Sequence, residues 1–490
     1  MSSFAERCGQ HDAAREAACA AVLRQVREQA IDLVRVSWCD LHGALRSKTL
    51  VAPALADALS GGVGMVSTLM LKDSSDRTAF KVFEPGLDAL LPGFGFANNV
   101  TLLPDPASFQ LLPWAPGTGW LQAQPWFADA SPVPIDTRRV LQGTLAHLAQ
   151  AGYGLRCGLE VEFHVYRIDD PRLDPEHAAW PAEPPRVSMI HPGYQLLCEA
   201  YGDLADEVLR IVQQTAQGLK LPLRSLEIEL GPSQFEAVFD PLDALAAADA
   251  MVLFRSGVRQ ALRRAGYHAS FVCRPPFPNA MASGWHLHQS LVDGTTGANA
   301  LCRDAAAPGS TPADAPHTLS PAGEHYLAGL LDHAPGMTSL CTPTVNGFGR
   351  FKPGALAPQA VLWGRDNRGA MLRVVGAAGD PGTHIENRLG EPAANPYLYI
   401  AAQIVAGLDG LQRRLVAAPA TDAPYGSAAR LLPTRLGAAL DAFESDHVMA
   451  AAWGPAFANS FVQVKRAEQA RHDAAADKAE WDRREYFGRL

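Results

Sequence analysis

The sequence has no long apolar run, no closely paired cysteines and no excess of positive charge. No stretch approaches the ~20 consecutive apolar residues that a membrane-spanning helix needs, and the opening MSSFAERCGQHDAARE lacks the apolar segment of a secretory signal. The eight cysteines include no CxxC pair, which argues against a zinc site and against a disulfide framework. We therefore expect a cytoplasmic protein with reduced thiols.

The balance of charge and the length limit the partners and the domain count. The 42 Lys and Arg residues against 51 Asp and Glu residues give a net charge of −9, so we expect neither nucleic acid nor acidic membranes as partners. A hydrophobic content of 48% with 19% charged residues is typical of a globular protein. A chain of 490 residues predicts two or three domains rather than one small core.

The first part of the chain predicts a small α+β unit. Residues 1–30, rich in Ala, Glu and Arg, indicate a helical extension, and residues 31–132 are assigned to the unit itself. Apolar and polar residues alternate in Ile31–Trp38 and again in Leu45–Val51, which predicts a β-hairpin whose turn contains Asp40. Asp40 is first of all a residue type that forms turns.

Two later stretches predict loops. Leu87–Pro134 is rich in Pro, Gly and Trp, shows little periodicity and predicts an irregular connection that ends at a domain boundary. Residues 133–490 then form a second, larger domain, in which the proline-rich residues 169–192 predict a further loop.

A pair of glutamates lies on one predicted strand of the larger domain. Gly158–Tyr166 reads GLEVEFHVY, an alternating pattern typical of a strand, so the side chains of Glu160 and Glu162 share a face and lie ~7 Å apart. Two carboxylates at that distance repel each other by about 2 kcal/mol at an effective dielectric constant of ~20. A solvated strand would tolerate this repulsion, whereas a buried strand would need cations between the carboxylates.

Other predicted strands carry more candidates of the same chemistry. WHLHQS places His286, His288 and Ser290 at alternate positions, and THIENR does the same for His384, Glu386 and Arg388. Together with the glutamates of the segment ELGPSQFE, they form a carboxylate-rich set that suits Mg²⁺ or Mn²⁺ better than Zn²⁺. Two such ions would serve phosphoryl transfer from ATP, and nearby arginines would bind carboxylate or phosphate. Each of these residues alone is more often a surface, salt-bridge or packed polar residue. Only their occurrence together favours a functional site.

Five ordered motifs carry a resemblance to a known family. They are GLEVEF, ELGPSQFE, SGWHLHQSL, DNRGAMLRV and HIENRLGEPAANPYLYIAA, and from about residue 30 to the C-terminus the chain resembles the glutamine synthetase superfamily. The resemblance implies an α+β fold with a small N-terminal β-grasp domain and a larger catalytic domain with an antiparallel sheet and flanking helices. It also implies a homo-oligomer, usually a dodecamer of two stacked hexameric rings, with each site shared between subunits.

The resemblance also implies roles for individual residues. The positions of the first metal ion correspond to Glu162, Glu229 and Glu236. Those of the second ion, which contacts the ATP phosphates, correspond to Glu160, His286 and Glu386. The nucleotide-contacting positions are His288, Ser290 and Arg373, and the glutamate-binding positions are Arg350 and Arg388. Arg368 matches the arginine that stabilises the transferred phosphoryl group, and Asp40 matches an aspartate that helps to bind ammonium from a neighbouring subunit.

The chain departs from the family where the ammonium would bind. Members that use ammonia carry a Tyr-Glu pair at the positions of Ala355 and Leu356, and an Asn-Gly pair that contacts glutamate where this chain has Met281-Ala282. Leucine neither binds a cation nor accepts a proton, and Ala355 frees the volume of a phenol ring. Together with Asp40, Ala355 and Leu356 would therefore line a pocket for an amine larger and less polar than ammonia.

The resemblance thus implies a ligase that joins the γ-carboxylate of L-glutamate to an amine through γ-glutamyl phosphate. An aniline or alkylamine fits an apolar pocket better than a polyamine or ethanolamine. Two alternatives remain open: a glutamine synthetase that uses ammonia with a substitute for the missing glutamate, and a non-catalytic structural or regulatory protein. A repulsive carboxylate cluster argues against the latter, since such a protein has no physical reason to keep it.

Overall fold

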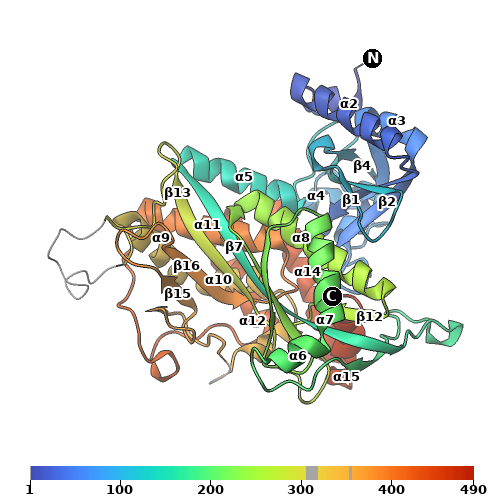
Figure 1. Ribbon diagram of the computed structural model, residues 1–490. Helices are drawn as coiled ribbons and strands as arrows, with labels where there is room; N and C mark the ends of the chain where they lie inside the picture. Colours follow the sequence, from blue (N-terminus) through green and yellow to red (C-terminus); the bar gives the residue numbers. More distant parts are fainter. Residues whose placement is uncertain (1, 305–317, 353–355) are drawn as a thin grey trace.

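The computed structural model describes residues 2–304, 318–352 and 356–490 (Figure 1). The strands of these residues form two sheets, a smaller one from the N-terminal part of the chain and a larger one from the remainder. In Figure 1 the smaller sheet, in blue, lies at one end of the molecule, and the larger sheet with its helices makes up the rest. None of the helices in the described ranges is long and apolar enough to cross a membrane.

The smaller sheet is mixed, with the strand order β2-β1-β6-β4-β3 and β5 beside β6. Its strands are β1 (Leu33–Cys39), β2 (Leu45–Val51), β3 (Val63–Val66), β4 (Asn99–Pro104), β5 (Gln110–Leu111) and β6 (Thr118–Trp126). β1 pairs with β2 in the antiparallel hairpin that the alternation predicts, and it pairs with β6 in parallel.

The prediction of an irregular connection over Leu87–Pro134 is wrong, because β4 and β6 lie within it. β6 is buried at all but one of its positions and has neighbours on both sides. A strand buried on both faces carries no alternation of polar and apolar residues. Periodicity therefore could not reveal it, and its Gly and Pro residues mimic a loop.

The larger sheet is organised around β7 (Tyr153–Asp170), which pairs directly with five other strands. The main strand order is β14-β15-β16-β13-β7-β10-β9, and every pair is antiparallel except β14 with β15. The other strands are β8 (Arg186–Met189), β9 (Leu223–Ile228), β10 (Gln234–Phe239), β11 (Leu242–Asp243), β12 (Tyr267–Ser270), β13 (Trp285–Asp293), β14 (Trp363–Arg365), β15 (Leu372–Val375) and β16 (His384–Gly390). β8 falls inside residues 169–192, so the prediction that this whole stretch is a loop is wrong in part.

The two faces of β7 have different environments. Leu159, Val161 and Phe163 are at most 1% exposed and belong to the main hydrophobic core, whereas Glu160 and Glu162 face the other way and are half-buried. Full burial of one large apolar side chain contributes about 1.5–3 kcal/mol, so the apolar face fixes the register of β7. A shift by one residue would exchange the two faces, and the glutamates are therefore held in place by the core behind them.

Helices cover the apolar side of the larger sheet and fill the C-terminal part of the chain (Figure 1). They are α1 (Phe4–Arg7), α2 (Ala13–Glu28), α3 (Leu55–Gly61), α4 (Leu87–Leu90), α5 (Thr137–Gln150), α6 (Glu199–Leu204), α7 (Asp206–Gly218), α8 (Ala244–Arg264), α9 (Pro321–Asp332), α10 (Ala334–Cys341), α11 (Pro396–Arg413), α12 (Leu436–Ser445), α13 (His447–Ala451), α14 (Gly454–Ala474) and α15 (Lys478–Asp482). Local sequence signals mark the start of α11. The side chain of Asn395 accepts hydrogen bonds from the amides of Tyr397 and Leu398, and Pro396 is the first helical residue.

A buried polar network joins the two sheets. Arg138 of α5 binds both carboxylate oxygens of Asp249 of α8, at 3.0 and 2.8 Å. Asp249 also accepts a hydrogen bond of 2.6 Å from the hydroxyl of Tyr397 on α11, which in turn accepts one of 2.7 Å from Gln122 of β6. Bidentate pairs of this kind are among the stronger polar contacts in proteins, so this network sets the position of the smaller sheet against the helices.

A buried histidine links three helices of the larger domain. His333, the residue after α9, contacts the carboxylates of Asp409 on α11 at 2.9 Å and of Asp446, the N-cap of α13, at 2.7 Å. Burial lowers the pKa of His333, but the two aspartates raise it by more, so the net shift is upward. The protonated ring therefore stabilises the fold at a pH below its ordinary pKa, and this contribution is lost as the pH rises through the raised value.

We predict that His333→Gln lowers the free energy of unfolding by about 1–3 kcal/mol in mildly acidic solution, because it removes the positive charge between two partly buried aspartates. The deficit should shrink in alkaline solution, where the wild-type ring has lost its proton. Thermal unfolding across this pH range measures the effect, with the exposed His147→Gln as the control. A deficit that does not change with pH would contradict the assignment of a charged His333.

Candidate functional site

One face of the larger sheet carries a continuous row of charged side chains. Glu162 of β7 lies directly opposite Glu236 of β10, and Glu160 lies opposite His286 of β13. Arg373 of β15 and His288 of β13 each lie opposite Glu386 of β16. Directly opposed residues of antiparallel strands share a face, so five neighbouring strands deliver these groups to one place. The alternation in the sequence predicts which side chains of one strand share a face. The register between strands then shows which side chains of different strands lie next to each other.

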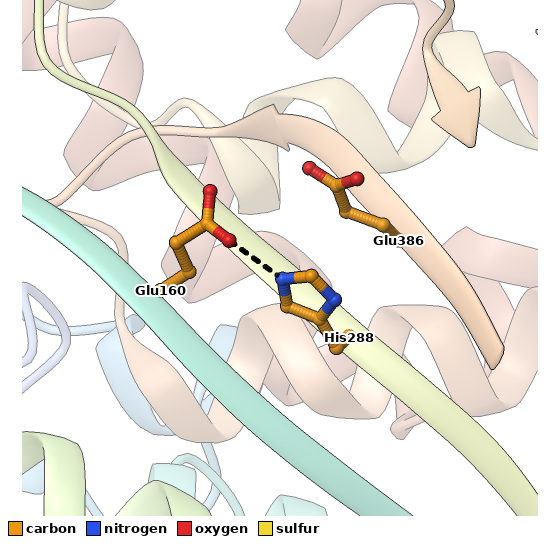
Figure 2. A group of neighbouring side chains, drawn as sticks. All are labelled: Glu160, His288 and Glu386. Atoms are coloured by element: carbon orange, nitrogen blue, oxygen red, sulfur yellow. Dashed lines mark hydrogen bonds and ion pairs between the residues drawn. The ribbon is translucent and has the colours of Figure 1, made fainter. Parts of the chain in front are cut away.

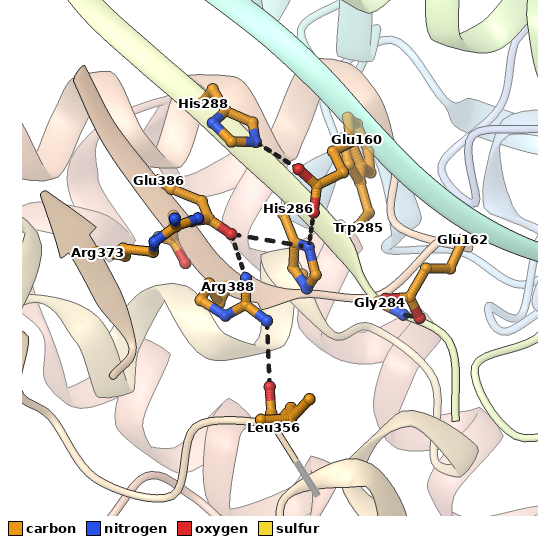
Figure 3. A network of polar contacts seen from close by, with 12 residues as sticks. Glu160, Glu162, Gly284, Trp285, His286, His288, Leu356, Arg373, Glu386 and Arg388 are labelled. Carbon is orange, nitrogen blue, oxygen red and sulfur yellow. Dashed lines mark hydrogen bonds and ion pairs between the residues drawn. The ribbon is translucent and has the colours of Figure 1, made fainter. Parts of the chain in front are cut away.

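Glu160 and Glu386 form an ionised pair held by histidines and arginines (Figures 2 and 3). Glu160 accepts from His286 at 2.6 Å and from His288 at 3.0 Å. Burial raises the pKa of Glu160, but the two histidines outweigh it and the net shift is downward. Burial is likewise outweighed at Glu386, where His286 and Arg388 hold the pKa at about 2.

A second group of glutamates next to this pair lacks such compensation. Burial and repulsion by Glu229 raise the pKa of Glu162 to about 7, and burial with repulsion by Glu160 and Glu162 raises that of Glu236 to about 10. The pKa of Glu229 is also raised, first by burial and then by Glu227 and Glu160. Glu162 accepts hydrogen bonds from the backbone amide of Gly284 at 2.8 Å and from the side-chain amide of Gln234 at 3.2 Å. Three crowded carboxylates with raised pKa values indicate missing positive charge.

The donor set fits hard divalent cations. Two groups each have one ligand atom per residue within 4.8 Å of the others: Glu160 with His288 and Glu386, drawn in Figure 2, and Glu160 with Glu236 and His286. Carboxylates dominate both groups, as Mg²⁺ and Mn²⁺ prefer. A cation would replace the protons that burial and repulsion leave on Glu162 and Glu236, and this supports the fit independently of the distances.

Arg373 and Arg388 lie beside the carboxylates (Figure 3). Arg373 binds Glu386 at 2.9 Å and also pairs with Asp366, and Arg388 pairs with Glu386 and donates to the carbonyl of Leu356 at 3.2 Å. The buried Nε of Arg388 has no hydrogen-bond partner among the described residues. A buried donor without a partner is costly, so this atom is a candidate for binding an anionic ligand.

Arg350 has its donors directed into the protein. Its Nη1 donates to the carbonyl of Arg388 at 2.9 Å, and its Nη2 lies 3.3 Å from Nε2 of His286. Its positive charge also lowers the pKa of Glu162, against the larger effect of burial. Arg350 therefore holds β16 and His286 in position, and its charge lies near Glu162.

A cavity of about 670 Å³ adjoins the carboxylates. Its wall includes Glu160, His288 and Ser290, and its other side is apolar, with Val238 and Phe239 of β10. Ser290 donates to the carbonyl of Thr383 at 3.1 Å, which fixes its hydroxyl at the rim. The size suits a ligand as large as a nucleotide, with one charged end and one apolar end.

Several residues singled out in the sequence contribute no side chain to this cluster. Arg368 is exposed in the turn between β14 and β15. Asp40 is buried in its hairpin, where it accepts from the amides of His42 and Ala44 at 3.0 Å and from Arg46 at 2.9 Å. Ala355 lies outside the described residues, whereas Leu356 is described, with its side chain 58% exposed and a φ of +51°. Met281 and Ala282 precede β13, and the carbonyl of Ala282 accepts a hydrogen bond of 3.2 Å from Gln234.

Sequence reasoning missed three residues that the structure places at the site. Gln234 orients Glu162, Asp366 holds Arg373, and the hydroxyl of Tyr425 contacts the carbonyl of Ala357 at 3.4 Å beside Leu356. Burial raises the pKa of Tyr425, while the charges of Arg388 and Arg350 oppose this rise, which places the phenol near both arginines. Gln234 lies two positions before Glu236 on the same strand and was visible to the alternation rule, whereas Tyr425 comes from an irregular segment and carried no signal.

The comparisons with known proteins agree with this geometry. The family described as "Glutamine synthetase, catalytic domain" matches residues 134–486. A γ-glutamylanilide synthase of an Acinetobacter species is 38% identical over 486 residues, covering 96% of this chain and 95% of that protein. The γ-glutamylethanolamide synthetase GlnA4 of Streptomyces coelicolor is 29% identical, covering 94% and 93%. A solved structure titled "GmaS/ADP complex-Conformation 1" superposes with a TM-score of 0.74 at 29% identity, covering 94% of this chain and 98% of that one.

Enzymes of this family use ATP and divalent metal ions, in accord with the carboxylate cluster and the cavity beside it. The similarity extends along almost the whole chain, in sequence and in fold. This chain therefore belongs to the glutamine synthetase family.

Proposed function

We propose that the protein is an ATP-dependent ligase that joins the γ-carboxylate of L-glutamate to a primary amine larger and less polar than ammonia. An oxygen of the γ-carboxylate attacks the γ-phosphorus of ATP and releases ADP, and the amine nitrogen then attacks the γ-carbonyl, loses a proton and expels phosphate. The observation that carries the proposal is the carboxylate cluster beside the cavity of about 670 Å³. The 38% identity to a γ-glutamylanilide synthase supports the choice of an amine other than ammonia.

Glu162, Glu229 and Glu236 would hold one divalent ion, and Glu160, His286 and Glu386 a second, with Mg²⁺ or Mn²⁺ as the candidates. Bound ions would neutralise charge on the phosphates of ATP. The support is the crowding that raises the pKa values of Glu162 and Glu236 and the closeness of Glu160, Glu386 and the histidines. His288 belongs to one of the close groups, so it would serve as a further ligand as well as a nucleotide contact.

The substrates would bind on either side of this cluster. His288 and Ser290 line the cavity next to Glu160, where they would contact the nucleotide, with Arg373 close by on Glu386. The free Nε of Arg388 would bind glutamate, and Arg350 would add positive charge and keep β16 in place. Arg368, exposed here, would act on the transferred phosphoryl group only after its turn moves toward the substrate.

The amine would enter between Leu356 and Tyr425. The carbonyl of Leu356 is held by Arg388, and Tyr425 contacts the next residue, so an apolar and an aromatic side chain flank the arginine that would bind glutamate. An aniline is neutral at neutral pH and needs no base before it attacks, whereas a protonated alkylamine needs an acceptor. Loss of the glutamate found in ammonia-using members thus matters least for an aniline.

Asp40 would complete the site of a neighbouring subunit. All of its partners lie in its own hairpin or at Asn395, whose side chain binds the carbonyl of Asp40 at 2.9 Å, and none belongs to the carboxylate cluster. Burial raises the pKa of Asp40, but Arg46 with the other contacts outweighs it, so the carboxylate stays ionised and suited to a cationic amine. A homo-oligomer, in the family's manner a dodecamer of two hexameric rings, would bring it to a partner's cluster.

The raised pKa values predict how the metal-free protein responds to pH. A carboxylate with a raised pKa stabilises the fold at low pH, and this contribution is lost as the pH rises through about 7, the value for Glu162. We predict that the melting temperature of the metal-free protein falls between about pH 6 and about pH 8, and that Mn²⁺ or Mg²⁺ reverses the fall.

The variant Glu236→Gln should be more stable than wild type in the metal-free state at about pH 8 and should lose the response to the ion together with turnover. The exposed Glu28→Gln at the end of α2 is the control and should behave as wild type. Scanning fluorimetry in chelator and in excess ion measures both states. A full response to the ion in Glu236→Gln would remove this residue from the metal site.

The amine preference can be changed at Leu356. We predict that wild type has a higher kcat/KM for aniline than for ammonium, and that Leu356→Glu lowers kcat/KM for aniline about tenfold or more, since burying leucine against a ring contributes about 1.5–3 kcal/mol. Release of phosphate from ATP plus glutamate is measured with ammonium, ethanolamine, putrescine, isopropylamine and aniline. Leu204→Glu, an exposed leucine of α6, is the control. Preference of wild type for ammonium would favour a glutamine synthetase instead.

A shared site predicts complementation between inactive subunits. Asp40→Ala removes the proposed contribution to the partner, and Arg388→Ala removes glutamate binding within the subunit. Mixed oligomers should regain part of the activity, because some sites then combine an intact Asp40 with an intact Arg388. The measurement is the rate of phosphate release after co-refolding, with mixing verified by differently tagged subunits; verified mixtures without activity would refute the shared site.

A further inference from the structure

A second large cavity lies away from the carboxylate cluster and includes none of its residues. Its volume is about 650 Å³, and its wall is made by the turn of the β1–β2 hairpin, by the C-terminal half of α8 and by the last residues of the chain. Asp40 belongs to the same hairpin but does not itself line the cavity. Nothing in the proposed reaction makes use of it.

The wall of this cavity is strongly positive. Arg255, Arg259 and Arg263 repeat every four residues along α8 and therefore lie on one side of the helix, and Arg264 and Arg489 also line the cavity. The one acidic side chain in the wall is Glu183, which pairs with Arg484 at 2.8 Å and also with Arg483. In the described part of the chain, no ion pair joins the α8 arginines of the wall to a carboxylate. Arg255 is buried, Arg259 half-buried and Arg263 exposed, and like charges at this helical spacing repel weakly, which favours a bound counter-charge.

The arginines of the wall differ in how many hydrogen bonds their side chains make within the protein. Arg255 is fully used in the fold, since it donates to the carbonyls of Gly43, Pro392 and Ala394. Among the described residues, the side chain of Arg259 makes one hydrogen bond, of 3.3 Å, to the carbonyl of Gly488. Burial, with the charge of Arg255, lowers the pKa of Arg259 to about 10, so it stays protonated, and it forms no ion pair with a described residue.

The positive charges of these arginines also act on the neighbouring His268. Burial lowers the pKa of His268 to about 4, and the charges of Arg259 and Arg263 add to this shift. His268 is held by the carbonyl of Phe487 at 2.8 Å, so its ring cannot turn away from the arginines without losing that bond. Burial is the larger cause of the lowered pKa at both groups, and the positive charge of neighbouring arginines adds to it.

We propose that this cavity is a binding site for a small organic anion with two or more phosphate or carboxylate groups, held chiefly by Arg259 and Arg263. Guanidinium forks bind such oxyanions in bidentate fashion, and the volume accommodates a molecule much larger than a single phosphate ion. The occupant would contact the same helix whose Arg255 holds Gly43, and so would lie against the hairpin of Asp40. The site does not depend on the ligase reaction proposed above.

The test uses the full-length protein in chelator, so that anions cannot bind through metal ions at the carboxylate cluster. Pyrophosphate and citrate are the two probes, each compared with sodium chloride at equal ionic strength, by scanning fluorimetry and titration calorimetry. We expect saturable binding of at least one probe, weakened about tenfold or more in Arg259→Gln and in Arg263→Gln, and less in Arg259→Lys, which keeps the charge but loses the fork.

Two controls locate the binding. Arg210→Gln, an exposed arginine on α7 paired with Asp206, and Arg388→Gln at the carboxylate cluster should both bind the probe as wild type does. Binding of pyrophosphate alone identifies a phosphate ligand, and binding of citrate alone a polycarboxylate. The proposal is overturned if neither probe binds beyond the salt control, as when acidic residues of a second copy fill the cavity, or if both arginine variants bind as tightly as wild type.

Discussion

The repulsion among carboxylates on one face of the larger sheet is the constraint on which this structure depends. Glu162 and Glu236 face each other across two strands, Glu160 lies two residues from Glu162, and Glu229 follows the next strand. Such a face is unfavourable unless protons, cations or positive side chains compensate it. The protein compensates half of it with histidines and arginines around Glu160 and Glu386, and leaves the other half to protons or metal ions.

Burial of the apolar side of the same strands offsets the repulsion among the carboxylates. Leu159, Val161 and Phe163 alternate with the glutamates and are buried against the helices, so any change of register that relieved the repulsion would expose a large part of the core. The two faces of the sheet therefore have different roles. The apolar face fixes the register of the strands, and the charged face carries the carboxylates of the proposed active site. The cavity for a nucleotide-sized ligand lies at the edge of the charged face, next to Glu160 and His288.

Much of the site could be predicted from alternation along single strands. The pairs Glu160 with Glu162 and His286 with His288 share a face because residues two apart on a regular strand do, and the family resemblance implies that these separate strands meet at one metal site. Strand β6 escaped prediction because it is buried along nearly its whole length. Tyr425 escaped because it comes from an irregular segment, where position in the sequence says nothing about position in space. The split between compensated and uncompensated glutamates depends on burial and on neighbours from other strands, which only the folded structure supplies.

We propose that glutamate is activated as an acyl phosphate before the amine attacks. The most direct measurement uses L-glutamate labelled with oxygen-18 in the γ-carboxylate, incubated with ATP, Mg²⁺ and the amine that the protein uses best. If the acyl phosphate forms, the inorganic phosphate released carries one labelled oxygen from the carboxylate, detected by mass spectrometry, and the product amide keeps the other. Unlabelled phosphate formed together with the amide would contradict it.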